Sequence, residues 1–461
     1  MKKTLVAMLI LMLALGLTWA ATAEERVTIE DYEVEPAEGG GWLIVRYVGT
    51  ERDLVIPGEL DGQPVVGLGN RAFAKSSLTS VQLPEGLTTV GGNAFTDCVN
   101  LREIIWPSTL VEIKAGALMG CEGLTTLELP EGLETLGNDA FANCVNLERV
   151  TISGSGLTVG NRAFMGCVKL SEAVIRPGVQ KLGEEVFGGC AALTRIEIPA
   201  SVMELDGAFL HCERLTELVI AEDHPFLYVS GNLLLDRLGK LVMRMPGSTM
   251  TRLRVPDDVT AIADYAFCGC ASLIRAEIPD QVTSVGYGVF AECPKLEYVG
   301  FPSAMTELPG AMFRNCTMLA NVTLPSGLTS IGNEAFAGCT ALKRITFPDT
   351  LTYIGENAFY RTGLTKVTFP ALTGCDLGTF HNCKALTEVR VAEGSTGLPY
   401  AGFIGCDRLR DVYIPASATY MGTEGFDDLS KVTFHVVPGS EAESYMIEHE
   451  LNYKTDYPVS Q

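Results

Sequence analysis

The sequence predicts a repeat solenoid of parallel strands and short helical turns, with a period of about 23 residues. A phenylalanine landmark, usually preceded by a small residue, recurs along most of the chain. Cysteine follows many landmarks three residues later, and proline recurs between them. A fixed period of this length indicates stacked repeats rather than several globular domains. The landmark positions are Phe73, Phe95, Leu118, Phe141, Phe164, Phe187, Phe209, Phe267, Phe290, Phe313, Phe336, Phe359, Phe380, Phe403 and Phe426.

One repeat shows how the unit is built. Residues 342–348 alternate apolar and polar side chains before a proline, which predicts a strand with one buried face that includes Phe347. A second short strand at 351–355 ends at Gly355, and Asn357 is expected to cap a short helical turn. Such a unit cannot bury its apolar side alone. Successive copies must therefore stack, with strands about 4.8 Å apart.

The recurring cysteines are expected to form a buried structural thiol ladder. Cysteine is small and among the most buried residue types, and Ser76, Thr362 and Leu429 take its place in other repeats. A nucleophile or metal ligand would not be so interchangeable. Disulfides between neighbouring positions are an alternative, although parallel side chains suit the S–S dihedral poorly. The ladder comprises Cys98, Cys121, Cys144, Cys167, Cys190, Cys212, Cys270, Cys293, Cys316, Cys339, Cys383 and Cys406.

The pattern L-x-x-I-x-L-P-x-x-L-x-x-I-G-x-x-A-F-x-x-C over residues 65–434 resembles the BspA-type (Treponema-type) leucine-rich repeat. The resemblance implies a right-handed, curved, leucine-rich-repeat-like β-solenoid. It also implies a bacterial protein that is secreted or on the cell surface, where members often act as adhesins. The motif defines no universal binding residues, so the resemblance assigns none to this chain.

The first 23 residues are predicted to be a secretory signal peptide. Lys2 and Lys3 precede a short apolar run, and Ala21-Thr22-Ala23 is a small-residue cleavage site. Cleavage after Ala23 would place the protein outside the cell or at its surface. No later segment has the pattern of a membrane span.

The remaining chain divides into an array and two caps. Residues 24–64 are expected to form an N-terminal β cap, and 65–434 the solenoid. The interval 221–255 interrupts the period and is predicted to be an enlarged coil with a β-hairpin, a domain break being the alternative. Residues 435–461 are expected to form a cap helix and tail, with Ser440 as helix N-cap.

Charge and motifs exclude several classes of function. The formal net charge of −22 disfavours nucleic acid and anionic membranes as partners. The pair Cys268 and Cys270 has no second cysteine pair nearby, so we expect no metal site. Histidine is scarce and no catalytic constellation is apparent. We therefore expect no catalytic residues, no cofactor and no enzymatic activity.

Four tyrosines are the candidate binding residues. Tyr353, Tyr400 and Tyr420 each lie two residues before the glycine that ends a second strand, and Asp376 takes that place in the coil after Tyr353. Tyr413 is expected to point outward from a first strand. Exposed aromatic rows bind sugars or proteins, whereas β-propensity alone would also place tyrosine on a strand.

The sequence thus predicts a secreted or cell-surface, non-enzymatic, adhesin-like protein. Its partner would be a host matrix protein or another cell-surface protein, or a glycan, bound through an extended repeat face. A polysaccharide-binding protein or an envelope scaffold is the alternative. The protein is expected to be a monomer.

Overall fold

The computed structural model describes residues 26–458, apart from 206, 213, 245–248 and 399–400. The signal peptide predicted at 1–23 and the candidate binding residue Tyr400 therefore lie outside the described residues. Among the described helices, none combines the length and the apolar composition needed to cross a bilayer.

The described chain forms two compact units, unit 1 up to Val229 and unit 2 from Ser230 onward. The boundary falls inside the interval in which the sequence predicts an enlarged coil. Unit 2 begins there with an antiparallel pair, β20 (Leu233–Asp236) and β21 (Lys240–Arg244). The Asp236 carboxylate accepts hydrogen bonds from two backbone N–H groups of the connecting turn, which fixes the reversal of the chain. That the two units form one continuous solenoid stays a prediction.

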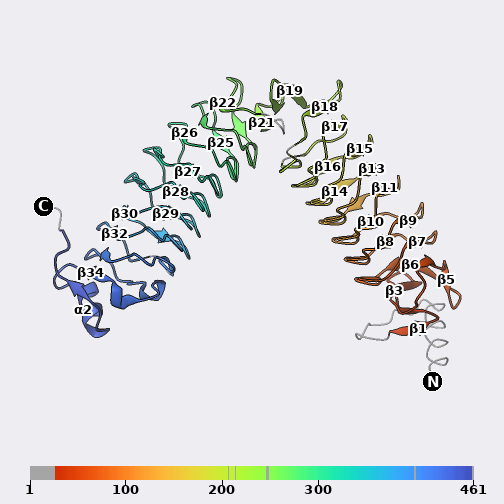
Figure 1. Cartoon of the computed structure of the whole chain (residues 1–461), viewed down its shortest axis with the longest axis horizontal. Helices are drawn as coiled ribbons and strands as arrows, with labels where there is room; N and C mark the ends of the chain where they lie inside the picture. The colour runs from red at the N-terminus through yellow and green to blue at the C-terminus, as the bar shows by residue number, and fades with distance from the viewer. Residues whose placement is uncertain (1–25, 206, 213, 245–248, 399–400, 459–461) are drawn as a thin grey trace. The chain divides into compact units, whose positions relative to one another are not determined.

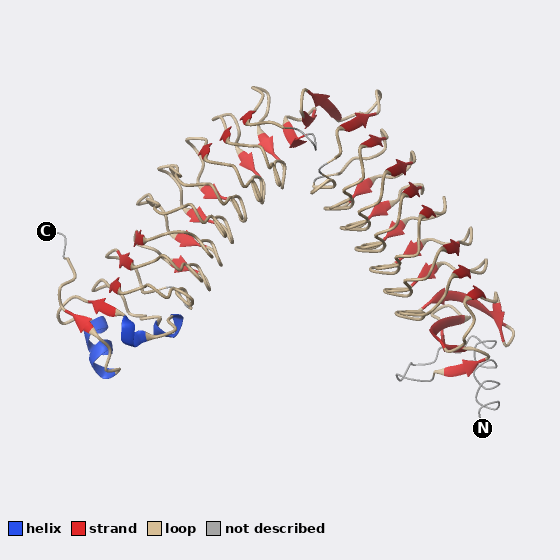
Figure 2. Cartoon of the chain, viewed as in Figure 1, coloured by secondary structure: helices blue, strands red, loops and turns tan. Residues whose placement is uncertain are grey.

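Most coils in each unit contribute two short strands joined by longer loops (Figure 2). The first strand precedes the proline of the repeat and the second follows it. Strands of successive coils pair in parallel at one period, so that Val150 lies opposite Leu127 and Ala173. The predicted parallel β-solenoid is confirmed. We call the two sets of stacked strands the first-strand series and the second-strand series.

Unit 1 starts with an antiparallel meander that joins the coils at β6. The buried Trp42 indole N–H donates to the Leu60 carbonyl and holds this end closed. The meander is β1 (Val27–Ile29), β2 (Tyr32–Pro36) and β3 (Trp42–Tyr47), beside β5 (Glu59–Leu60). The first-strand series is β4 (Asp53–Val55), β7 (Ser80–Gln82), β9 (Glu103–Ile105), β11 (Thr126–Glu128), β13 (Arg149–Ile152), β15 (Glu172–Ile175), β17 (Arg195–Ile198) and β18 (Glu217–Ile220). The second-strand series is β6 (Gln63–Leu68), β8 (Thr89–Val90), β10 (Glu112–Ile113), β12 (Thr135–Leu136), β14 (Thr158–Val159) and β16 (Lys181–Leu182), and β19 (Leu227–Ser230) lies at the boundary.

Unit 2 repeats this arrangement up to its C-terminal elements (Figure 1). Its first-strand series is β22 (Arg252–Arg254), β24 (Arg275–Glu277), β26 (Tyr298–Gly300), β30 (Lys366–Phe369), β32 (Glu388–Val391), β33 (Asp411–Tyr413), β34 (Thr433–His435) and β35 (Tyr453–Lys454). Its second-strand series is β23 (Ala261–Ile262), β25 (Ser284–Val285), β27 (Glu307–Leu308), β28 (Ser330–Ile331), β29 (Tyr353–Ile354) and β31 (Gly374–Cys375). The strand predicted at 342–348 is not formed. Residues 320–325 in the preceding coil also lack a strand, so the first-strand ladder is interrupted over these two coils, between β26 and β30. Phe347 is nevertheless buried, as predicted.

The C-terminal end is covered by helical elements. The helix α2 (Glu441–Glu448) begins after Ser440, whose hydroxyl accepts a hydrogen bond from the Glu443 N–H, so the predicted N-cap is confirmed. Ala442 and Met446 are its buried residues. Two short 3-10 turns precede it, η1 (Thr423–Gly425) and η2 (Leu429–Lys431).

The landmark phenylalanines form a buried spine within each unit. In unit 2 the rings stack from Phe267 to Phe426, and the centroids of Phe313 and Phe336 are 5.4 Å apart. In unit 1 Leu118 takes one place in the spine and is equally buried. Burial of large apolar side chains in every coil supplies the main stabilisation of the stack.

The turn that follows Gly355 is not helical, and the predicted cap role of Asn357 is wrong. Asn357 has a φ of 52°, in the left-handed region, which interrupts a helix. Its N–H donates to the Leu377 carbonyl of the next coil, and the Phe359 N–H donates to Thr379. These N–H groups therefore bond between coils rather than along a helix. The Asn333 side chain also acts between coils, accepting from the Glu356 N–H.

The cysteines of the ladder are free, buried thiols. Each of several thiols donates to the carbonyl of the landmark residue one coil earlier, as Cys121 does to Phe95 and Cys339 to Phe313. Where a hydroxyl residue takes the slot, its oxygen contacts the next thiol instead, as Thr362 does with Cys383. The ladder thus adds a hydrogen bond between coils to the packing of a small side chain.

We expect the thiols of the folded protein to react slowly with a disulfide reagent such as DTNB. Burial raises the pKa of the Cys144 and Cys212 thiols to about 12, so little thiolate exists at neutral pH. Unfolding in guanidinium should release all 14 thiols. Rapid labelling of several thiols in the native state would show that the ladder is accessible and would contradict this expectation.

Candidate binding surfaces

The candidate tyrosines do not form one row. Tyr353 and Tyr420 lie in the second-strand register, Tyr413 lies on β33 of the first-strand series, and Tyr400 is outside the described residues. Tyr353 pairs with Gly374, and Gly397 forms a bridge with Tyr420. Glycines therefore occupy the slot that the sequence assigned to Asp376 and Tyr400. The coil before Gly374 is shorter than the usual period, which shifts the register; a binding role for these tyrosines stays a prediction.

The second-strand side of unit 2 carries an unbroken column of threonines, which the sequence analysis missed. One threonine precedes the second strand, or the isolated bridge that takes its place, in eight consecutive coils, and all eight side chains are exposed. The Thr329 hydroxyl donates to the Thr306 carbonyl at 3.0 Å, and Thr352 donates to Thr329 at 3.2 Å. The column, called the threonine column below, comprises Thr260, Thr283, Thr306, Thr329, Thr352, Thr373, Thr396 and Thr419. The recurrence of threonine at the repeat period would have revealed this column in the sequence.

An open groove of about 560 Å³ runs beside this column. It spans β25, β27 and β28, which follow one another along unit 2 (Figure 1), and Tyr353 on β29 forms one wall. Its lining includes Ser284, Ser330 and Glu307 as well as threonines of the column. The groove is therefore rich in hydroxyl groups and carries a carboxylate.

Tyr353 is held in a fixed position at the edge of the groove. A Cβ at Gly374 would lie 3.1 Å from the Tyr353 ring, so the ring lies against this glycine. Its hydroxyl donates a short hydrogen bond to the Asp376 carboxylate, and this bond raises the pKa of Tyr353 to about 12. The residue remains 37% exposed. A smaller groove of about 220 Å³ lies beyond it, lined by Gly374, Gly397 and Tyr420 among others.

A second surface lies on the first-strand series near the C-terminus, and we call it the C-terminal stack. The Arg390 guanidinium carbon lies 3.8 Å from the centroid of the Tyr413 ring. The Tyr413 ring stacks on His435 with centroids 4.1 Å apart. The three residues occupy neighbouring positions of β32, β33 and β34 in the parallel register. The sequence predicted Tyr413 to point outward, but gave no sign of its two partners.

Carboxylates hold the C-terminal stack in place. The His435 Nδ1 lies 2.6 Å from Asp456, and its Nε2 lies 3.1 Å from Asp411. Only a doubly protonated ring can donate to both carboxylates. Glu388 accepts from Arg390 and from Lys366. The stack is thereby fixed before any partner arrives, which lowers the entropic cost of binding.

We expect acid to weaken the attachment of the C-terminal tail at the C-terminal stack. The hydrogen bond to His435 lowers the pKa of Asp456 below its ordinary value. A carboxyl group whose pKa is lowered by folding stabilises the protein above its ordinary pKa, and this contribution is lost as pH falls through the lowered pKa. The Asp456→Asn variant should therefore show a smaller drop in melting temperature between pH 7 and pH 3.

The control for this measurement is Asp349→Asn, which removes an exposed carboxylate elsewhere on unit 2. It should keep the pH dependence of the unmodified protein. Equal pH profiles for Asp456→Asn and the unmodified protein would contradict the role given to Asp456.

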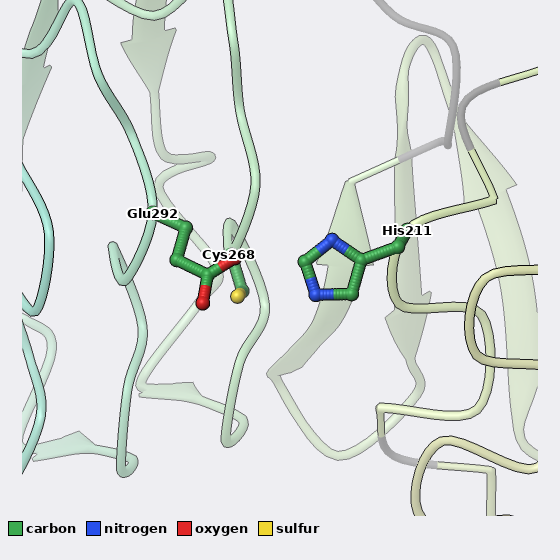
Figure 3. Close-up of side chains that lie close together, drawn as sticks. All are labelled: His211, Cys268 and Glu292. Carbon is green, nitrogen blue, oxygen red and sulfur yellow. The ribbon is translucent and has the colours of Figure 1, made fainter. Parts of the chain in front are cut away.

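Cys268 and Glu292 lie on successive coils of unit 2, and Figure 3 shows the thiol beside the carboxylate. Their ligand atoms lie within 4.8 Å of one another. Within unit 2 the Glu292 carboxylate also lies 3.7 Å from Arg314. Two donors are fewer than the three or four protein ligands of a zinc site, so this pair alone does not form one. His211, also labelled in Figure 3, belongs to unit 1.

Comparisons with known proteins agree with this architecture. A protein-family model described as BspA type leucine rich repeat region matches six copies, over residues 63–171, 139–228, 246–336 and 312–433. A leucine-rich cell surface protein from Faecalibacterium prausnitzii A2-165 is 27% identical, with a TM-score of 0.54 over 81% of this chain and 96% of the other.

Two further solved structures are similar at lower identity. A leucine-rich repeat protein from Bacteroides ovatus ATCC 8483 is 22% identical, with a TM-score of 0.46 over 89% of this chain and 99% of the other. The pneumococcal vaccine antigen PcpA is 17% identical, with a TM-score of 0.47 over 95% of this chain and 99% of the other. No curated protein sequence matches the chain.

Proposed function

The chain belongs to the BspA-type leucine-rich repeat family, and we propose on that premise that it is a non-enzymatic, adhesin-like binding protein. It is secreted or held at the bacterial cell surface. It binds host matrix proteins or proteins of neighbouring cells through an extended face of its repeats. It acts as a monomer and needs no cofactor.

The observation that carries this proposal is the C-terminal stack on a rigid frame. Arginine and tyrosine are enriched among the residues that dominate the affinity of protein interfaces. Arg390 and Tyr413 are held by their neighbours, and the Arg390 side chain remains 36% exposed. The recurring apolar residues of each repeat are buried in the core. Only the strand positions that face outward can therefore change in residue type without loss of the core.

Four observations support a surface location and a non-enzymatic binding role. The similar protein from Faecalibacterium prausnitzii is described as a cell surface protein. The sequence predicts a signal peptide that would direct this chain outside the cell. Proteins of this fold are typically binding scaffolds, and the buried thiols with raised pKa values are poor nucleophiles.

The proposal is tested with the purified chain lacking residues 1–23, by surface plasmon resonance on fibronectin, laminin, collagen and fibrinogen. We expect saturable binding to at least one of them. The Tyr413→Ala substitution should weaken that binding at least about tenfold, as truncation of an interface anchor does.

The matched control is Tyr298→Ala. Tyr298 also lies on the first-strand series and also has an arginine over its ring, with Arg275 at 3.9 Å. This control should bind normally, and both variants should melt close to the unmodified protein. Absence of binding to every protein of the panel, or equal loss in both variants, would refute a role of the C-terminal stack in adhesion.

A further inference from the structure

The threonine column is more regular than packing requires. Its eight positions are exposed and all carry threonine. The same slot in unit 1 holds Thr88, Val111, Glu134, Leu157, Gln180 and Met203, which follow one another through equivalent backbone hydrogen bonds or the same period. Valine, glutamate, glutamine and methionine all occupy this position in unit 1. Neither the stacking of coils nor β-propensity therefore explains why threonine occupies it in eight successive coils of unit 2.

The hydrogen bonds of the column determine what it offers to a ligand. Thr329, Thr352 and Thr373 each donate their hydroxyl proton to the carbonyl of the threonine one coil earlier. A hydroxyl that donates its proton keeps lone pairs that can accept. Because coils stack about 4.8 Å apart, the column presents acceptors at that interval along unit 2.

Tyr353 adds an aromatic wall at the same place. It is fixed by Gly374 and Asp376, and it lines the groove of about 560 Å³ beside the column. A ring immobilised before binding loses little entropy when a ligand stacks on it. Tyr420 lies three coils further along, about 14 Å away at the coil spacing.

The charge of the groove narrows the class of ligand. Its lining holds the carboxylates Asp280 and Glu307 and neither lysine nor arginine. Together with the net charge of −22, this disfavours sulfated or uronic acid polymers. A ligand that suits the groove donates hydrogen bonds at regular intervals, carries no negative charge and has a C–H face for an aromatic ring.

We propose that the threonine column and Tyr353 bind a neutral polysaccharide that runs along the second-strand series of unit 2. A pyranose ring is about as long as one coil spacing, so successive sugars meet successive threonines. Sugar hydroxyls donate to the threonine oxygens and to Glu307, and the C–H face of one ring stacks on Tyr353. This site goes beyond the proposed adhesion to proteins, because it uses another strand series and another class of ligand.

Affinity gel electrophoresis of the purified chain with dextran, yeast mannan, xylan and a soluble β-glucan tests the proposal, with chondroitin sulfate as anionic polymer. We expect retardation by at least one neutral polymer and none by chondroitin sulfate. Tyr353→Ala should raise the dissociation constant at least about tenfold. The double variant Thr329→Val and Thr352→Val should do the same, since it removes two acceptors and conserves side-chain shape.

Thr88→Val is the matched control, since Thr88 occupies the same slot in unit 1 and is also exposed. Tyr298→Ala controls for the loss of an exposed tyrosine. Both should bind as the unmodified protein does. Tyr353→Phe and Thr329→Ser keep the ring and the hydroxyl, and they should retain most of the affinity, which guards against misfolded alanine or valine variants.

Failure to bind any of the four neutral polymers would overturn the proposal. So would binding that the Tyr353 and threonine variants leave unchanged, or retardation by chondroitin sulfate alone. Tyr413→Ala should leave polysaccharide binding unchanged. The polysaccharide site and the proposed adhesion to proteins can therefore be refuted independently of each other.

Discussion

Replacing Phe336 by alanine is expected to lower the free energy of unfolding by about 3–5 kcal/mol. The Phe336 side chain is fully buried, and its ring lies between Phe313 and Phe359 at centroid distances of 5.4 and 5.2 Å. Alanine would leave a cavity across three coils, and it would also remove two ring contacts. Because each coil packs only on its neighbours, the loss falls on the two interfaces of this coil, and no other contact across the array compensates for it.

Urea unfolding followed by circular dichroism measures this effect, and Phe336→Leu is its matched control. Leucine already fills the equivalent place in unit 1, where Leu118 is fully buried in the spine. The leucine variant should therefore lose clearly less stability than the alanine variant. Equal losses in the two variants would mean that ring stacking and cavity volume do not set the stability of the spine.

Replacing Gly332 by alanine is expected to cost on the order of 3 kcal/mol, although it adds one methyl group. A Cβ at this position would lie 2.5 Å from the Gly310 nitrogen and 2.8 Å from its Cα. Both atoms belong to the backbone of the preceding coil, so the clash cannot be relieved by turning a side chain. The coils would have to separate locally, which weakens their hydrogen bonds.

Gly327→Ala tests whether this cost comes from the coil contact. It lies in the same coil, and a Cβ there would meet nothing within 4 Å. Thermal melting of the two variants should show a drop for Gly332→Ala and almost none for Gly327→Ala. A similar drop in both would assign the effect to backbone conformation instead of to contact between coils.

The repeat could be predicted from the sequence because the residues that define its period are the buried residues of the core. Phenylalanine, cysteine and proline recur at one period, and a period shared by core residues leaves few alternatives to stacking. The cap role of Asn357 could not be predicted correctly, because the Asn357 N–H itself donates to the next coil. That choice depends on a neighbour 20 residues away in sequence, Leu377.

The binding surfaces were harder to predict, for two physical reasons. A shortened repeat before Gly374 moves the register, so that counting from the glycine placed Asp376 in the slot that Gly374 occupies. The C-terminal stack brings Tyr413 together with His435 and with Asp456 from the tail, where the repeat has ended. Periodicity gives no register for residues beyond the last repeat.

The register of one period between coils has a genetic consequence. Since Phe336 N–H bonds to Ala358, and Phe313 N–H to Ala335, each coil within unit 2 presents the same backbone groups to the next. An in-frame gain or loss of one whole repeat by recombination would thus join surfaces that already match. Copy number within such a gene can change in steps without a new core, and the length of the exposed face becomes a quantity on which selection can act directly.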